Sequence, residues 1–172
     1  FLREQQLSLD PARVRIVLLA RTVDRANPAR SLALQAPSLE IPADAPPPVW
    51  VNEAAADLYG FLPGAVIVLP LDGKPQRFTV AGIWRDYVRQ NGALVIDLAL
   101  YRKLTADPLV TDAALWLTPG AHPHNVVARL RSSVAGGALL EIASPGEIRR
   151  LSLSIFDRTF AVTYALEAAA VI

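Results

Sequence analysis

The chain contains no cysteine, and this absence removes several kinds of chemistry. It excludes disulfide bonds, thiolate nucleophiles and zinc sites with cysteine ligands. Charged residues make up only 19% of the 172 positions and aromatic residues 7%. The 17 basic and 16 acidic residues leave a formal charge of +1, without a long run of either sign. Because nucleic-acid binding needs a basic surface, we expect no nucleic-acid partner.

The sequence also has few motifs that indicate catalysis. Gly60 and Gly64 are not followed by the Gly-Lys-Ser/Thr of a phosphate-binding loop, and no Gly-x-Ser-x-Gly motif is present. His122 and His124 are separated by one proline, a spacing that does not indicate a metal site by itself. We therefore predict a non-enzymatic protein with no catalytic residue, metal or cofactor. A small hydrolase that uses carboxylates or the histidine pair is an alternative with less support.

Hydrophobic residues make up 52% of the chain, enough for an ample core. The last 14 residues, Thr159 to Ile172, contain one charged residue, Glu167, and no glycine or proline. A membrane-spanning helix needs about 20 apolar residues, so this run is either a core helix or the first half of a membrane helix. The chain begins at Phe1 without a basic segment followed by an apolar one. We expect it to be a piece of a longer protein.

Local patterns predict strands and short helices in the first two thirds of the chain. Arg13–Ala20 has a β-branched centre and is predicted as a strand. The stretch from Ala36 to Pro48 has five prolines and is predicted as an extended connector. Val49–Val51 is predicted as a short strand. Asn52 should cap a helix that ends at Tyr59, with Gly60 as its stop.

A β-hairpin is predicted from Ala65–Leu69 and Gln76–Trp84, joined through Asp72-Gly73. The alternation in the second strand assigns one face to Phe78, Val80 and Gly82 and the other to Thr79, Ala81 and Ile83. Asn91-Gly92 indicates a turn before a strand at Ala93–Ile96. Asp97 should then cap a short helix that runs to Leu104.

The rest of the chain, from Ala113 onward, predicts a different arrangement of helices and strands. Ala113–Leu117 and Leu139–Ala143 are predicted strands, with a helix from Pro123 between them. This is a βαβ unit whose short crossover fits half of a split ferredoxin-like motif. A long helix should start at Pro145. These elements predict an α+β fold.

The stretch Ile83–Gln90 is a possible interaction patch, because tryptophan, tyrosine and arginine are frequent at the centres of protein interfaces. Its candidate residues are Trp84, Arg85, Tyr87 and Arg89. In the alternative, which we favour, Trp84 fills the core and Arg85 and Asp86 form a surface ion pair of small energy.

Three segments carry a resemblance to a known family: Val49–Gly64, Phe78–Asp86 and Ile155–Tyr164. The first has a strand, a short helix and a glycine-bounded turn before a hairpin. The second reads Phe-Thr-Val-Ala-Gly-Ile-Trp-Arg-Asp, and the third is an apolar approach to the C-terminal run. With these segments in this order, the chain resembles the extracytoplasmic domain of FtsX/MacB-type ABC transporter permeases.

The resemblance implies a fold with a βαβ-containing lobe and an inserted, smaller and mostly β lobe. We assign residues 1–48 to an N-terminal strand and proline-rich connector of the first lobe and 49–108 to the small β-rich lobe. Residues 109–144 are assigned to the βαβ lobe, and 145–172 to a helix that leads toward the membrane.

The resemblance further implies a domain between the first two membrane helices of a permease in the bacterial cytoplasmic membrane, facing the periplasm or cell exterior. It would couple a separate cytoplasmic ATPase to export or to lipoprotein or lipid translocation. The expected partners are this ATPase, a second permease subunit, an unknown periplasmic cargo or adaptor, and the membrane through flanking helices. The membrane-coupling residues would be Ile155, Phe156, Arg158, Phe160 and Tyr164. The alternative is a freestanding α+β binding module without membrane attachment.

Overall fold

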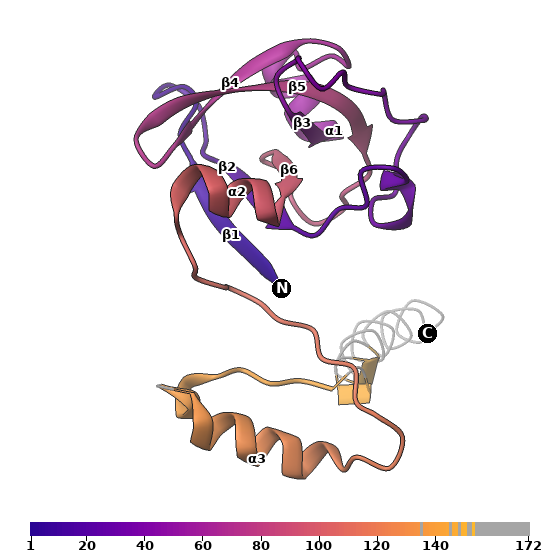
Figure 1. Ribbon diagram of the computed structural model, residues 1–172, viewed down its shortest axis with the longest axis vertical. Helices are drawn as coiled ribbons and strands as arrows, with labels where there is room; N and C mark the ends of the chain where they lie inside the picture. The colour runs from indigo at the N-terminus through magenta and orange to yellow at the C-terminus, as the bar shows by residue number, and fades with distance from the viewer. Residues whose placement is uncertain (135, 145, 148, 151–152, 154–172) are drawn as a thin grey trace, which may run out of the picture. The chain divides into compact units, whose positions relative to one another are not determined.

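The computed structural model describes residues 1–134, 136–144, 146–147, 149–150 and 153 (Figure 1). The chain divides into two compact units, Phe1–Leu115 and Trp116–Ile172. The boundaries predicted after residues 48 and 108 both fall within the first unit. The five membrane-coupling residues named from the sequence lie outside the described residues.

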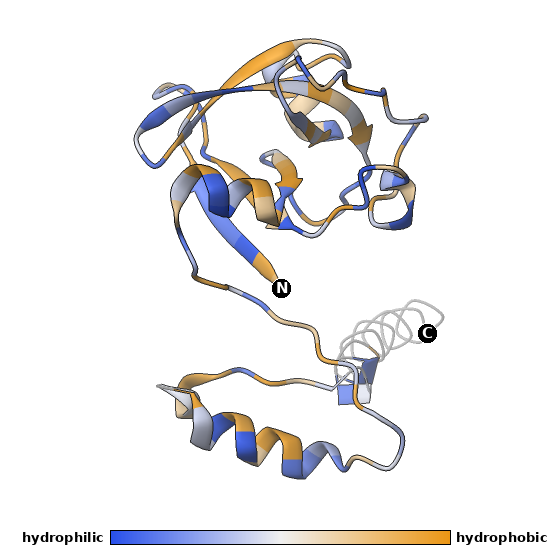
Figure 2. Cartoon of the chain, viewed as in Figure 1, coloured by the Kyte–Doolittle hydropathy of each residue, from blue (hydrophilic) through white to orange (hydrophobic). Residues whose placement is uncertain are grey.

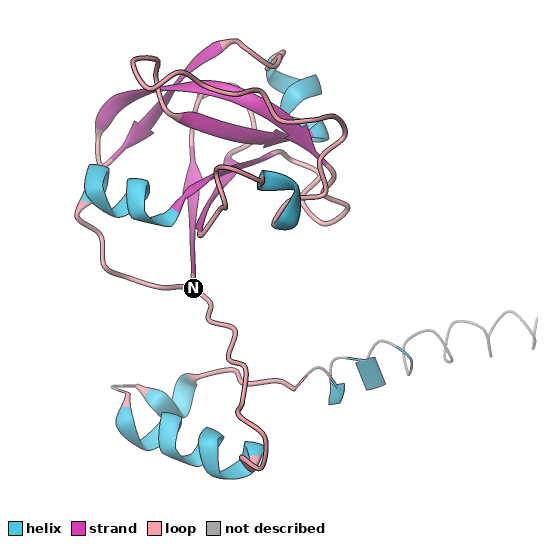
Figure 3. Cartoon of the chain, turned by 45° about the vertical axis from the view of Figure 1, so that its right-hand side comes forward, coloured by secondary structure: helices cyan, strands magenta, loops and turns pink. Residues whose placement is uncertain are grey.

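The first unit is built on a six-stranded mixed sheet with the strand order β1-β2-β6-β3-β5-β4 (Figures 1 and 3). The strands are β1 (Leu2–Leu7), β2 (Ile16–Arg21), β3 (Pro48–Asn52), β4 (Val66–Leu71), β5 (Lys74–Trp84) and β6 (Ala93–Asp97). The pairs β2–β6 and β3–β5 are parallel, and the other pairs are antiparallel. Together with the helices, this sheet confirms the α+β class.

Alternate residues of the central strands enter two separate core clusters, because successive side chains of a strand point to opposite faces. Val49 and Val51 join one cluster, to which helices α1 (Glu53–Tyr59) and α2 (Leu98–Thr105) also contribute. Trp50, between them, joins the other cluster with Leu32. The connector between β2 and β3 covers this second face. Trp50 donates its indole N–H to Ser38 Oγ over 3.0 Å, so the proline-rich connector is bonded to the sheet.

The predicted helix boundaries of this unit are confirmed by their caps. The Asn52 side chain accepts a hydrogen bond from the Ala55 N–H, and Gly60 ends α1 at a φ of 68°. Asp97 accepts hydrogen bonds from two backbone N–H groups at the start of α2. The Asn52 and Asp97 caps satisfy donors that a helix leaves unpaired in its first turn.

The β4–β5 hairpin is also confirmed. Asp72 and Gly73 both have positive φ angles, 48° and 69°, as the central residues of a type I′ turn require. Pro70 and Pro75 stand opposite each other, next to the pair that closes the turn. In a two-residue hairpin that closing pair is hydrogen-bonded and the next one is not. The two prolines, which have no backbone N–H, therefore stand at the pair where the strands make no hydrogen bond to each other.

The alternation predicted for β5 fails at a β-bulge. Phe78 and Val80 share the first cluster as expected, but Val49 pairs with Val80 while the next residue, Trp50, pairs with Gly82. Ala81 is the extra residue of the bulge. A side chain on Gly82 would start 3.5 Å from Trp50, so Gly82 lies on the Trp50 face, and Ile83 returns to the face of the first cluster. The assignment of Gly82 and Ile83 was wrong because a bulge shifts the two-residue period by one.

Strand β1 was not predicted from the sequence. Figure 2 shows it as a mostly hydrophilic ribbon, and only Leu7 in it is buried. A strand at the sheet edge is specified by its backbone pairing with β2 more than by an apolar pattern.

The second unit contains the predicted helix, α3 (Pro123–Ser133). Ala113–Leu117 and Leu139–Ala143 are not strands, so the βαβ unit is wrong for the described residues. Two strands without further neighbours are only marginally stable, and the described part of this unit offers no strand to pair with them. Among the described helices, none combines the length and hydropathy needed to cross a bilayer.

Gly92, at the start of β6, is expected to be intolerant of any side chain. It has a φ of 100°, and an added Cβ would start 3.0 Å from Ile16 Cδ1 and 3.3 Å from Ala55 Cα. Gly92→Ala should therefore lower the free energy of unfolding by about 2 kcal/mol or more. Gly73→Ala is the matched control, because Gly73 also has a positive φ but has open space around it. Gly73→Ala should lower the free energy of unfolding by about 1 kcal/mol, as measured by chemical denaturation. Equal losses in both variants would contradict the close packing inferred at Gly92.

Candidate interaction surface

The loop between β5 and β6 carries the most conspicuous exposed side chains of the predicted patch. Tyr87 is 83% exposed and its neighbour Val88 80%. Tyrosine combines a large apolar ring with a hydroxyl group and is frequent at the centres of interfaces. An adjacent exposed tyrosine and valine are therefore candidates for a contact with another molecule.

The base of this loop is held by Asn52, whose side chain is fully buried. Asn52 Oδ1 accepts hydrogen bonds from the N–H groups of Ala55, at 2.9 Å, and Ala93, at 2.8 Å. Its Nδ2 donates to the carbonyl oxygen of Arg89 over 2.9 Å. One amide side chain thus connects the start of α1, the start of β6 and the end of the loop.

Ion pairs fix the middle of the loop. Asp86 Oδ1 accepts from the N–H of Val88 over 3.0 Å, and Asp86 Oδ2 lies 3.3 Å from the Arg89 guanidinium. The same guanidinium lies 3.3 Å from Glu4 Oε2 on β1. The side chain of Asp86 is only 4% exposed, so this network is better shielded from water than an ordinary surface pair. Tyr87 and Val88 therefore project from a loop that is bonded on both sides.

The four residues of the predicted patch do not share one environment. Trp84 is partly buried against the second core cluster, and its indole N–H has no hydrogen-bond partner among the described residues. Arg85 is exposed, and Arg89 is partly buried in its ion pairs. The expected Arg85–Asp86 pair is replaced by Asp86–Arg89, because the turn brings residues three apart together. That the loop binds a partner stays a prediction.

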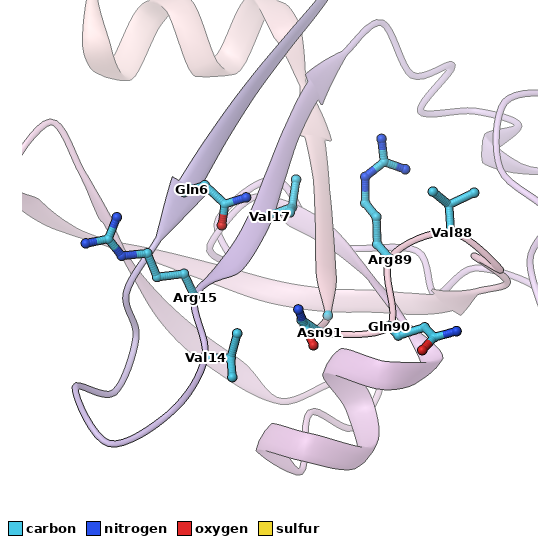
Figure 4. Close-up of a pocket in the computed structure, with 9 residues that line it drawn as sticks. Gln6, Val14, Arg15, Val17, Val88, Arg89, Gln90 and Asn91 are labelled. Atoms are coloured by element: carbon cyan, nitrogen blue, oxygen red, sulfur yellow. The ribbon is translucent and has the colours of Figure 1, made fainter.

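An open pocket of about 390 Å³ lies beside the loop (Figure 4). In Figure 4, Gln6, Val14 and Arg15 stand on one side of it and Arg89, Gln90 and Asn91 on the other. The nine lining residues are Gln6, Val14, Arg15, Val17, Val88, Arg89, Gln90, Asn91 and Gly92. None of them is acidic. Val14 and Arg15 are more than 70 residues from the loop in the sequence, so no local pattern connects the two segments.

A second feature of the first unit is a clasp between β1 and the segment 107–112, which follows α2. Arg3 Nε lies 2.8 Å from Asp107 Oδ2, and the Tyr101 hydroxyl donates to the same oxygen over 2.9 Å. Leu2 exchanges backbone hydrogen bonds with Asp112 at 2.8 and 3.1 Å. The two ends of the first unit are therefore joined side by side.

The clasp changes the ionisation of its members. The N–H of Leu109 and the guanidinium of Arg3 hold the pKa of Asp107 below its usual 3.8. The carboxylate in turn raises the pKa of Arg3. Burial, followed by the neighbouring Asp107, raises the pKa of Tyr101. Each shift favours the ionised Asp107–Arg3 pair with a neutral Tyr101.

The histidines stand apart from these features. His122 and His124 are both exposed at the start of α3, and His122 makes no side-chain cap there. Within the described residues, no three histidine or carboxylate side chains gather where they could hold a metal ion.

Comparison with known proteins links the chain to transporters. No family model matches it. It is similar to an uncharacterized ABC transporter permease protein of Mycobacterium tuberculosis, with 34% identity over 111 residues. The matched region covers 64% of this chain and 13% of that relative. The likeness supports a relation to ABC transporter permeases and suggests a transporter component.

Replacing Asn52 should release the loop. Asn52→Asp keeps an oxygen for the two N–H donors but loses the donor to the Arg89 carbonyl and buries a charge. We expect a loss of about 2–4 kcal/mol of unfolding free energy. We also expect faster hydrogen exchange at the amides of residues 86–92. Asn91→Asp, at an exposed position, should change the stability by less than about 0.5 kcal/mol. Unchanged stability and exchange in Asn52→Asp would refute the anchoring role.

The clasp should contribute stability that depends on pH. Because the pKa of Asp107 is lower in the folded than in the unfolded chain, its contribution is present above pH 3.8 and is lost as pH falls through its folded value. Asp107→Asn should therefore be less stable than the parent at pH 7, and the difference should shrink below pH 3.8. Urea denaturation across this range measures it. A difference independent of pH would show that the ionised carboxylate contributes nothing.

Proposed function

We propose that this chain is the extracytoplasmic domain of an ABC transporter permease of the FtsX/MacB type. In this proposal the domain lies between two membrane helices of a longer permease and faces the periplasm or the cell exterior. The similarity to a mycobacterial permease carries the transporter part of the proposal. The FtsX/MacB type rests on the order of the Val49–Gly64, Phe78–Asp86 and Ile155–Tyr164 segments.

The proposed role is mechanical and non-catalytic. ATP hydrolysis would belong to a cognate ATPase on the cytoplasmic side, and a second permease subunit would complete the transporter. The domain would pass movement between the membrane helices and an extracytoplasmic cargo or adaptor. The Ile155–Tyr164 segment would form its connection to the membrane.

The clasp suits this role. β1 begins at Leu2, and the segment 107–112 lies close to Leu115, the last residue of the first unit. Since Leu2 and Asp112 are paired by backbone hydrogen bonds, a displacement of one end of the unit is transferred directly to the other. The unit would then move as one body, and its anchored loop would follow that movement.

A freestanding binding module is the second candidate. The exposed Tyr87 and Val88 favour a protein contact in either case. The two candidates differ in whether the parent protein is held in the membrane and on which side this domain lies.

Cysteine labelling of the full-length protein in cells tests the proposal. Tyr87→Cys introduces a thiol at a highly exposed site of a stretch that has no cysteine of its own. A membrane-impermeant maleimide should label it in intact spheroplasts, and the labelled protein should stay in the membrane fraction. Val95→Cys is the matched control at a fully buried site and should stay unlabelled until the protein is unfolded.

Two results would contradict the proposal. Labelling only after the membrane is broken would put the domain in the cytoplasm. Labelled protein that washes off the membrane would favour the freestanding module.

A further inference from the structure

We propose that the pocket between the start of β2 and the 88–92 loop binds an acidic and apolar polypeptide segment of a partner protein, and that the exposed Tyr87, next to the lining residue Val88 in the chain, adds to the contact. The inference rests on the proposed function, since it gives the chemistry of the extracytoplasmic partner. Its test is a binding measurement that does not depend on membrane topology.

The surface is fixed before any partner arrives. Asn52 and the Asp86–Arg89–Glu4 ion pairs hold the loop, and the N–H of Val17 donates to the Gly92 carbonyl oxygen over 3.1 Å across the pocket floor. A surface that is already ordered loses little entropy when a partner binds. Exposed Tyr87 and Val88 are therefore suited to contact.

One lining residue, Arg15, gives the pocket a charge that can pair with an anionic group. Two arginines line it and no carboxylate does. Arg89 is paired with two carboxylates, Glu4 and Asp86, so it offers no free positive charge to a ligand. Arg15 is exposed, and among the described residues it forms no ion pair. Arg15 at the rim therefore offers an uncompensated positive charge to a carboxylate, which a guanidinium binds with two parallel hydrogen bonds.

The remaining lining residues fit a polypeptide chain. Gln6, Gln90 and Asn91 are exposed, and their amide groups make no side-chain hydrogen bond among the described residues. Such amides can both donate to and accept from peptide groups. Val14, 62% exposed, and Val88 add apolar contacts for a side chain of the segment. Because the pocket is open, a small molecule would leave much of its surface in water, whereas a protein segment can continue past Val88 onto the exposed surface that follows.

The experiment uses three acetylated and amidated pentapeptides, Val-Val-Glu-Val-Val and its variants with Gln or Lys at the centre. Each is titrated into the isotope-labelled 172-residue chain while amide chemical shifts are recorded. The Glu peptide should shift the amides of Val17, Val88 and Gly92 and bind roughly fivefold or more tightly than the Gln peptide. The Lys peptide should bind more weakly than both.

Matched variants identify the residue responsible. Arg15→Gln should remove the preference for Glu over Gln, and Arg15→Lys should keep part of it. Arg21→Gln, at the exposed far end of β2 and outside the pocket, should leave the preference unchanged. Tyr87→Ala should weaken the binding of the neutral and the acidic peptide to a similar extent.

Four results would overturn the inference. These are no shifts with any peptide, equal binding of the Glu and Gln peptides, shifts that lie away from the pocket, and an Arg15→Gln variant with the parent's preference. Vesicles of anionic lipid provide a further comparison. If they shift the same amides and the Glu peptide does not, the surface recognises lipid headgroups and the protein-partner inference is wrong.

Discussion

The buried amide of Asn52 is the interaction on which the first unit depends most. It lies where the central strand β3 passes into α1, and it satisfies three backbone groups from three different segments. Without it, two N–H groups and one carbonyl would have to find other partners in a region closed to water, at a high cost in free energy. Since β3 pairs with both β5 and β6, this one residue also sets how the loop between those strands closes.

Local sequence signals predicted the parts of the fold that depend on neighbours in the chain. Asn52, Gly60 and Asp97 mark helix ends through bonds to residues only a few positions away, and the Asp72-Gly73 turn needs only its own φ angles. The role of Asn52 as a helix cap could therefore be predicted from the sequence. Its bonds to Arg89 and Ala93 were not, because they join residues about 40 positions apart.

The missed features share a dependence on pairing between distant segments. Strand β1 is polar and gains its structure from β2, and the bulge at Ala81 appears only when β5 is aligned with β3. Conversely, Ala113–Leu117 has the composition of a strand but no neighbour that makes it one among the described residues. For the candidate site, Tyr87 could be named from its residue type alone. Arg15 could not, since only the folded sheet brings it to the loop.

The paired prolines of the β4–β5 hairpin have a consequence for the solubility of the protein. β4 is an outer strand of the sheet, and its Val66 and Val68 are about half exposed, at 45% and 54%. An outer strand of this kind can template the addition of strands from other molecules. Pro70 belongs to a pair whose backbone groups point away from β5, so at this position the outer edge has no N–H to offer. The hairpin thus keeps its internal bonds, while the end of the outer edge next to the turn lacks a donor that an added strand would need.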